Sequence, residues 1–230
     1  MTFNEFNLKD LLQKAIDEAG FKEPSPIQEQ AIPFVLAGRD IVGQAHTGTG
    51  KTAAFGLPIL NNMKGNSGVE AVVIVPTREL AMQVSDELYR FGKFLGVNTA
   101  TVYGGQAYAR QIKLIENAGI IVATPGRFLD LLRGNKIDIK PDYVILDEAD
   151  EMLDMGFLDD IKEIFTFLPK ERQTLLFSAT MPLAIKNLAK TILNDPEFIT
   201  LTKSDVTNSK ITQTFYVVDE RERDDALIRL

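Results

Sequence analysis

Residues 45–52, with the sequence AHTGTGKT, constrain the fold of this chain more than any other stretch. They follow a short apolar run at residues 40–44 and precede a segment with a helical pattern. Small residues at such a junction let the backbone wrap closely around phosphate oxygens, and the first N–H groups of the following helix can bind an anion. The stretch therefore predicts a P-loop, which binds phosphate where a strand of an α/β sheet leads into a helix.

Every residue of this loop is a candidate for binding a nucleotide: Ala45, His46, Thr47, Gly48, Thr49, Gly50, Lys51 and Thr52. Lys51 would place a positive charge on the β and γ phosphates, and Thr52 would be a ligand of Mg²⁺. Ala45 stands where a glycine is usual. His46, the single histidine of the chain, is expected to contribute only its backbone. The alternative interpretation is a Gly/Thr-rich turn without a ligand.

Short β-branched apolar runs alternate with helical stretches along the chain. The runs lie at residues 40–44, 71–75, 98–103, 120–123, 143–146, 174–177 and 198–201. Several are apolar at successive positions, as strands covered on both faces should be. The alternation predicts an α/β fold with a mostly parallel, twisted sheet and helices on both of its faces.

Two helices have clear sequence signals. Ser25 before Pro26 is typical of a helix start, and Gly38 is typical of a helix end. Pro33 is expected to kink or split that helix. Residues 77–95 predict a long amphipathic helix that packs on the sheet through one apolar face.

Acidic residues follow the run at residues 143–146. Asp147 comes where the strand ends, so it can hold Mg²⁺ at the carboxyl edge of the sheet, opposite the P-loop. Glu148 could orient the attacking water or accept its proton. The alternative is a solvated acidic turn, which is what most charge runs are.

The composition limits the class of protein. The chain has 230 residues, no cysteine and a net charge of −7. Neither a signal peptide nor an apolar run long enough to span a membrane is visible, so we expect a cytoplasmic protein. The negative charge argues against a broad electrostatic footprint on nucleic acid, and any contact with nucleic acid must be local.

We expect one domain at residues 1–201, a polar linker at 202–210, and the start of a second domain at 211–230.

The sequence Asp147-Glu148-Ala149-Asp150, about a hundred residues after the P-loop, resembles the signature of DEAD-box RNA helicases. Other motifs of that family match in order. They are GFKEPSPIQ at residues 20–28 with Phe3 upstream, PTRELA at 76–81, Gly104-Gly105, TPGR at 124–127, and Ser178-Ala179-Thr180. The resemblance implies a RecA-like domain that uses ATP and Mg²⁺ and that binds RNA through its backbone with little sequence preference.

The resemblance also implies roles for individual residues. Gln28 and Phe21, in the Q motif within about residues 1–30, would recognise adenine. Asp150, Ser178 and Thr180 would couple hydrolysis to unwinding. The RNA-binding residues would be Thr77, Arg78, Gly104, Gly105, Thr124 and Arg127. Taken without the resemblance, Gln28 is an exposed helix residue, the RNA set is ordinary surface, and Ser178 and Thr180 could equally be helix caps.

The resemblance also implies a second domain, whose arginines would close over the γ-phosphate. We therefore expect this chain to bind adenine nucleotide and to hydrolyse it very slowly. Alternatives remain open. They are a DNA-directed helicase or another P-loop ATPase, an ATP-gated RNA clamp or scaffold with little unwinding, and a small-molecule kinase.

Overall fold

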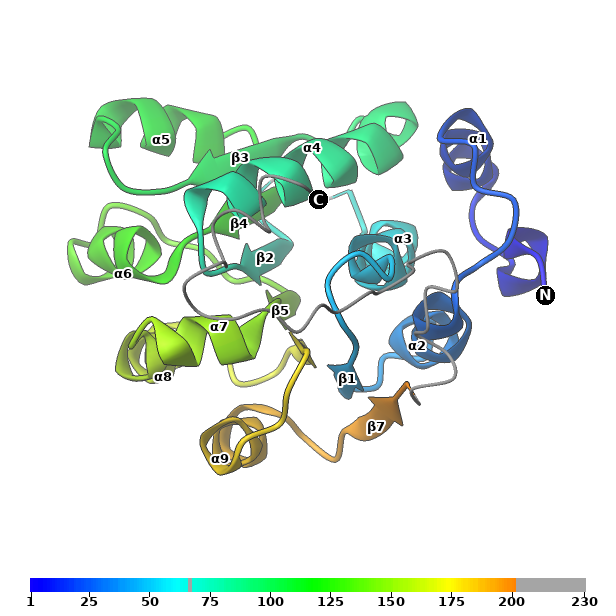
Figure 1. Cartoon of the computed structure of the whole chain (residues 1–230). Coiled ribbons are helices and arrows are strands. Elements are labelled where there is room, and N and C mark those ends of the chain that lie inside the picture. Colours follow the sequence, from blue (N-terminus) through cyan, green and yellow to red (C-terminus); the bar gives the residue numbers. More distant parts are fainter. Residues whose placement is uncertain (66–67, 202–230) are drawn as a thin grey trace, which may run out of the picture.

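Seven short strands form one sheet in the computed structural model, which describes residues 1–65 and 68–201 (Figure 1). The predicted linker and the predicted start of a second domain lie outside the described residues. The strands are β1 (Ile41–Gln44), β2 (Ala71–Ile74), β3 (Thr99–Val102), β4 (Ile120–Ala123), β5 (Tyr143–Leu146), β6 (Gln173–Ser178) and β7 (Glu197–Thr200). Their order is β3-β4-β2-β5-β6-β1-β7, and every neighbouring pair is parallel.

Helices cover both faces of this sheet (Figure 1). One face carries α1 (Asp10–Glu18), α2 (Pro26–Leu36), α3 (Lys51–Asn62) and α4 (Arg78–Gly92). The other carries α5 (Tyr108–Ile115), α6 (Pro125–Arg133), α7 (Ala149–Asp154), α8 (Leu158–Phe167) and α9 (Leu183–Ile192). Short 3₁₀ segments η1 (Phe3–Phe6) and η2 (Lys93–Leu95) complete the described helical elements. The predicted fold class is confirmed.

The central strands show why the runs are apolar at successive positions. In β2, Ala71 and Val73 face the core under α2, α3 and α4, whereas Val72 and Ile74 face the core under the other helix layer. All four side chains of β2 are buried, and the same is true of β4. Because side chains alternate between the faces of a strand, a sheet covered on both sides requires apolar residues at every position.

Pro33 does not split α2, which runs unbroken from Pro26 to Leu36. A proline in a helix removes one backbone donor, which usually weakens the helix. Here Ile27, Ala31, Ile32 and Val35 are completely buried. Packing against α3 and β1 therefore outweighs the lost hydrogen bond, and the expectation of a split was wrong. The helix ends at Leu36 with Ala37 as its C-cap, and Gly38, expected near the helix end, follows with φ +76°.

The long amphipathic helix is confirmed, with one change at its end. It is α4, which begins after Thr77 and gives way to the 3₁₀ turn η2. Val84, Leu88 and Phe91 are buried on the face toward the sheet. In the described part of the chain, every helix is too short or too polar to cross a membrane.

Candidate functional site

The predicted site residues gather at one edge of the sheet. In a parallel sheet all strands point the same way, so the segments that follow them share the carboxyl edge. The P-loop follows β1, and the DEAD sequence follows β5. Strand β6 lies between these two strands; Ser178 is its last residue, and Ala179 and Thr180 follow it. Segments more than a hundred residues apart in the chain therefore become neighbours.

The P-loop has the backbone conformation that its glycines allow. Gly48 has φ +81° and Gly50 has φ +90°, a region that side chains rarely adopt. Gly50 precedes α3, whose first residue is Lys51. Ala45 is buried, and its N–H donates to the carbonyl oxygen of Ser178 at 3.1 Å. The side chain of His46 is exposed, as expected for a residue that contributes its backbone.

Lys51 lies between the two carboxylates of the DEAD sequence. Its Nζ is 2.7 Å from Oε1 of Glu148 and 3.6 Å from Oδ1 of Asp147, and it donates to the carbonyl oxygen of Ala45 at 3.2 Å. All three side chains are less than one-tenth exposed. An uncompensated charge would be very costly at such burial, so the lysine and the carboxylates stabilise one another.

The carboxyl group of Asp147 has an unusual proton affinity. Burial raises its pKa to about 6, the positive charge of Lys51 opposes this rise, and the negative charge of Glu148 adds to it. Glu148 is also held in place, because Thr47 donates its hydroxyl proton to Oε1 at 2.8 Å. Its backbone has φ +56°, a left-handed conformation that costs a non-glycine residue roughly 1 kcal/mol or more. Strain of this kind concentrates at functional sites.

Thr52, the predicted Mg²⁺ ligand, lies in the first turn of α3 and hydrogen-bonds to the carboxylate of Glu87 on α4. Burial raises the pKa of Glu87, and the bond from Thr52 lowers it in part. A hydroxyl that donates to a carboxylate keeps its oxygen lone pairs for a metal. Glu87 is a residue that sequence reasoning missed, since one glutamate on an amphipathic helix carries no distinguishing signal.

Within residues 1–65 and 68–201 there is no group of three or more His, Asp or Glu residues that could hold a metal. The chemistry of Mg²⁺ does not require one. Magnesium retains several waters and is commonly bound by one or two carboxylates together with substrate phosphates. Asp147 and Thr52 therefore fit a magnesium ion that arrives with a polyphosphate.

Gln28 connects the Q motif to the P-loop. Its Oε1 accepts from the Ser25 N–H at 2.9 Å, and its Nε2 donates to the carbonyl oxygen of Gly50 at 3.0 Å. The hydroxyl of Ser25 donates to the carbonyl oxygen of Thr49 at 2.7 Å. Gln28 is only 5% exposed, so the interpretation as an exposed helix residue was wrong. Both ends of its amide are used within the protein.

Phe21 lies in an aromatic cluster beside the Q motif. Its ring is stacked on Phe3 with centroids 6.1 Å apart and is tilted against Phe91 at 5.9 Å. The side chain of Phe21 is still 36% exposed, whereas Phe3 and Phe91 are buried. The cluster therefore holds the Phe21 ring in a fixed position while part of it faces solvent.

Arg78 is held by the loop after β3. Its Nη2 donates to the carbonyl oxygen of Gly104 at 2.8 Å, and its guanidinium lies 5.0 Å from the ring centre of Tyr103. A Cβ at Gly105 would lie 3.0 Å from the same nitrogen, so the glycine permits this close approach. Thr77 accepts from the N–H of Leu80 and caps α4.

Arg127 is held by the same loop. Its Nη1 donates to the carbonyl oxygen of Gln106 at 2.7 Å and to Oε1 of Gln111 at 2.9 Å, and its guanidinium lies over Tyr108. Gln111 is completely buried and donates to the carbonyl oxygen of Tyr103. Thr124 precedes α6 as its N-cap residue. The structure thus brings Arg78 and Arg127 to the loop that contains Gly104 and Gly105, whereas Thr77 and Thr124 lie at the starts of α4 and α6. Gln111 is a support that the sequence did not single out.

The three predicted coupling residues are in direct contact. Thr180 donates from both its N–H and its hydroxyl to Oδ2 of Asp150, each at 2.8 Å. The N–H of Asp150 donates to the hydroxyl of Ser178 at 3.1 Å. The α9 helix begins only at Leu183, after Pro182. Of the two interpretations of Ser178 and Thr180, contact with Asp150 is therefore the one observed.

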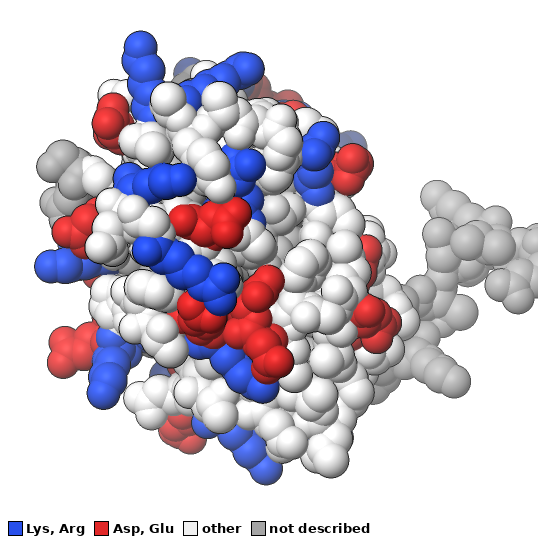
Figure 2. Space-filling model, turned by 90° about the vertical axis from the view of Figure 1, so that its left-hand side faces the viewer, with Lys and Arg blue, Asp and Glu red and all other residues white. Residues whose placement is uncertain are grey.

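Charges of both signs are mixed on the outer surface. Figure 2 shows Lys and Arg next to Asp and Glu over the face that carries α5, α6 and α8. Some of them are paired, such as Arg133 with Glu163 and Lys162 with Asp159. Because the two signs compensate one another there, this face has no broad basic footprint.

Comparisons with known proteins agree with this arrangement. Residues 25–188 match the family model described as DEAD/DEAH box helicase. The chain is 57% identical to the DEAD-box ATP-dependent RNA helicase RhpA of Helicobacter pylori and 48% identical to CshA of Bacillus subtilis. Each match covers all of this chain and 47% of the relative, so the chain spans about half the length of these proteins.

Solved structures give the same result. A crystal structure of a DEAD box protein from the hyperthermophile Methanococcus jannaschii matches with a TM-score of 0.85 and 45% identity, over all of this chain and 62% of that one. A hypothetical ATP-dependent RNA helicase from Sulfolobus tokodaii matches with a TM-score of 0.79 and 42% identity, over 84% of this chain and 57% of that one.

Proposed function

Because the chain belongs to the DEAD/DEAH box helicase family, we propose that it is the ATP-binding part of an ATP-dependent RNA helicase. One observation carries the proposal: Lys51 of the P-loop lies buried between Asp147 and Glu148 at the carboxyl edge of the sheet. A lysine and two carboxylates beside a phosphate-binding loop are the groups that phosphoryl transfer needs.

Binding would replace contacts within the protein by contacts to the nucleotide. The P-loop N–H groups and the start of α3 would bind the phosphates, and Lys51 would move from Glu148 toward them. Asp147 and Thr52 would hold Mg²⁺, which neutralises phosphate charge during transfer. Glu148, released from Lys51 but still bonded to Thr47, would then be free to orient water or accept its proton.

Adenine recognition would involve Gln28 and Phe21. An amide can donate and accept at one base edge at the same time. In the described structure the Gln28 amide is bonded to Ser25 and Gly50, so reading adenine would require it to share or exchange these bonds. Gln28 would thereby link the base to the P-loop backbone. Phe21 offers the partly exposed ring against which a base can stack.

RNA would bind at the loop that holds Arg78 and Arg127. Both guanidiniums are positioned by carbonyl oxygens and aromatic rings, and a fixed planar fork suits phosphate. Contacts of this kind carry little sequence information.

Asp150, Ser178 and Thr180 join the ends of β5 and β6 through hydrogen bonds. A change in the position of Glu148 would therefore be transmitted to the segment that precedes α9.

Calorimetry with the 230-residue chain tests the nucleotide site. We expect Mg²⁺–ADP to bind to the wild type and to Lys64→Ala, an exposed lysine outside the site, and we expect Lys51→Ala to abolish binding. Lack of binding by correctly folded wild type would refute the proposal.

A competition between ATP and GTP tests adenine recognition. The preference for ATP over GTP should be smaller in Gln28→Ala than in the wild type. His46→Gln should leave ATP affinity unchanged, because its side chain is exposed.

Assays on the full-length protein would distinguish the other candidate functions. Stronger stimulation of its ATPase activity by DNA than by RNA would indicate a DNA-directed enzyme. Binding of RNA without strand displacement would indicate an ATP-gated clamp or scaffold. The intact set of Lys51, Asp147 and Glu148 supports turnover.

A further inference from the structure

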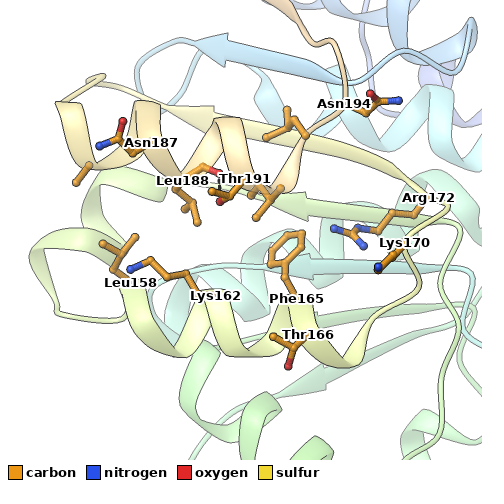
Figure 3. Close-up of a pocket in the computed structure, with 13 residues that line it drawn as sticks. Leu158, Lys162, Phe165, Thr166, Lys170, Arg172, Asn187, Leu188, Thr191 and Asn194 are labelled. Carbon is orange, nitrogen blue, oxygen red and sulfur yellow. Dashed lines mark hydrogen bonds between the residues drawn. The ribbon is translucent and has the colours of Figure 1, made fainter.

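We propose that the groove between α8 and α9 is a docking site for an acidic, amphipathic helical segment of a partner protein. The groove has a volume of about 750 Å³ and is lined by residues of both helices and of the segments that follow them. Figure 3 shows its side chains, with Phe165 of α8 facing Leu188 and Thr191 of α9. It is separate from the residues assigned above to nucleotide and RNA.

The floor and walls of the groove are largely aliphatic and aromatic. Leu158 and Phe165 come from α8, and Leu188, Ile192 and Leu193 come from the α9 side. Each of α8 and α9 has ten residues, so the groove is about 15 Å long, enough for two to three turns of a third helix. Apolar side chains spaced three to four residues apart along such a helix could enter it.

The charges of the residues that line the groove indicate what kind of helix can bind there. Three cationic side chains line the groove, Lys162 toward one end and Lys170 and Arg172 toward the other (Figure 3). Among the described residues no Asp or Glu lines it, although the whole chain has 32 acidic and 25 basic residues. Asp159 lies beside Lys162 and Asp40 lies near Arg172, but neither carboxylate lines the groove. A groove lined by cations and by no carboxylate is complementary to a ligand that carries carboxylates beside its apolar residues.

The cations differ in how they are held. The guanidinium of Arg172 lies 4.7 Å from the ring centre of Phe165 and donates to the carbonyl oxygen of Pro169 and to the hydroxyl of Thr174. Lys162 forms an exposed pair with Asp159, and Lys170 has no ion-pair partner within the described chain. Arg172 is thus fixed in the wall, while the two exposed lysines can turn toward a bound carboxylate.

The apolar lining favours a peptide over RNA. One face of Phe165 is already covered by Arg172, and the other apolar residues of the lining are aliphatic. This suits leucine-like side chains better than stacked bases. The α9 helix also starts five residues after Ser178. A partner in this groove would therefore contact the helix that follows the Asp150–Thr180 contact.

Fluorescence anisotropy with the 230-residue chain tests the proposal. The probe is a set of labelled 15-residue helical peptides with leucine at every third or fourth position and glutamate beside it, together with the same set carrying lysine in place of glutamate. We expect the glutamate peptides to bind, the lysine peptides not to bind, and the affinity to fall with added salt. Lys162→Glu combined with Lys170→Glu should weaken binding at least tenfold.

Two controls separate the groove from general electrostatics. Lys113→Glu combined with Lys140→Glu makes the same charge change at exposed positions outside the groove and should leave binding unchanged. Thr191→Arg adds positive charge but fills the groove, and it should abolish binding. Circular dichroism establishes that each variant is folded.

Four results would overturn the proposal. They are no binding by any glutamate peptide, binding that Lys162→Glu/Lys170→Glu leaves unchanged, binding of a labelled 15-nucleotide RNA that the same variant abolishes, and a dimer in sedimentation velocity that Thr191→Arg dissociates. The last two would assign the groove to RNA or to a second copy of the chain.

Discussion

Asp150 contributes to stability through hydrogen bonds that require its charge. Burial raises the pKa of its carboxyl group, but bonds from Thr180, Ser178 and Ala179 together bring the pKa below the ordinary value of 3.8. Because the folded-state pKa is the lower one, the carboxylate stabilises the fold above pH 3.8, and this contribution is lost as the pH falls through the folded-state pKa.

We therefore predict that Asp150→Asn lowers the free energy of unfolding by about 1 kcal/mol at pH 7, after allowance for solvent screening. The deficit should narrow below about pH 4, where the wild-type carboxylate also becomes protonated. Urea denaturation across this pH range measures the effect. Asp154→Asn, an exposed residue of the same helix, should cause no such loss, and equal losses in both variants would contradict the explanation.

Gly50 combines a left-handed backbone with a close contact. A Cβ there would lie 2.3 Å from Nε2 of Gln28, whereas a Cβ at Gly48 would have no atom within 4 Å. Both glycines have positive φ, so alanine at either position costs roughly 1 to 2 kcal/mol for the backbone alone. Gly50→Ala should cost about 1 kcal/mol more than Gly48→Ala in thermal denaturation.

The extra cost should disappear when Gln28→Ala is combined with Gly50→Ala, because the colliding amide is then absent. Persistence of the extra cost in the double variant would show that the contact with Gln28 is not its source.

At the scale of elements, the approach of α4 to α3 depends on Gly56. A Cβ at this position would lie 2.5 Å from Cδ2 of Leu88, which is almost completely buried. Gly56→Ala should lower the free energy of unfolding by about 1 to 2 kcal/mol, although alanine is the better helix former. Gly126→Ala in α6, where a Cβ meets nothing within 4 Å, should be neutral or stabilising by up to about 1 kcal/mol.

A Leu88→Ala background supplies the check on this interpretation. In that background Gly56→Ala should no longer be destabilising, since the side chain that it meets has been shortened. Equal destabilisation in both backgrounds would exclude overpacking as the cause.

At the scale of the whole molecule, the chain spans about half the length of the curated relatives that it matches. Phosphoryl transfer in P-loop enzymes gains on the order of 10³ to 10⁵ from an additional arginine. We predict that the 230-residue chain binds Mg²⁺–ATP but hydrolyses it very slowly and without stimulation by RNA. A phosphate-release assay measures this, and RNA-stimulated turnover by the chain alone would contradict it.

The sequence by itself was sufficient for the fold class, the seven strands, the P-loop and its position before a helix. These features depend on local patterns: runs of apolar residues, glycine where φ is positive, and caps at helix ends. The same patterns allowed a split at Pro33 that does not occur, because the local cost of proline was outweighed by packing of α2 against α3 and β1.

Contacts between segments that are distant in the sequence could not be predicted from local patterns. Lys51 meets Glu148, Gln28 meets Gly50, and Arg127 meets Gln111, and each pair is brought together by strand order or by helix packing. Burial of Gln28, support of Thr52 by Glu87, and the groove between α8 and α9 likewise became visible only in the folded chain. The physical reason is that hydrogen bonding, desolvation and charge complementarity depend on which groups lie within a few ångströms in space, and separation along the chain does not determine that.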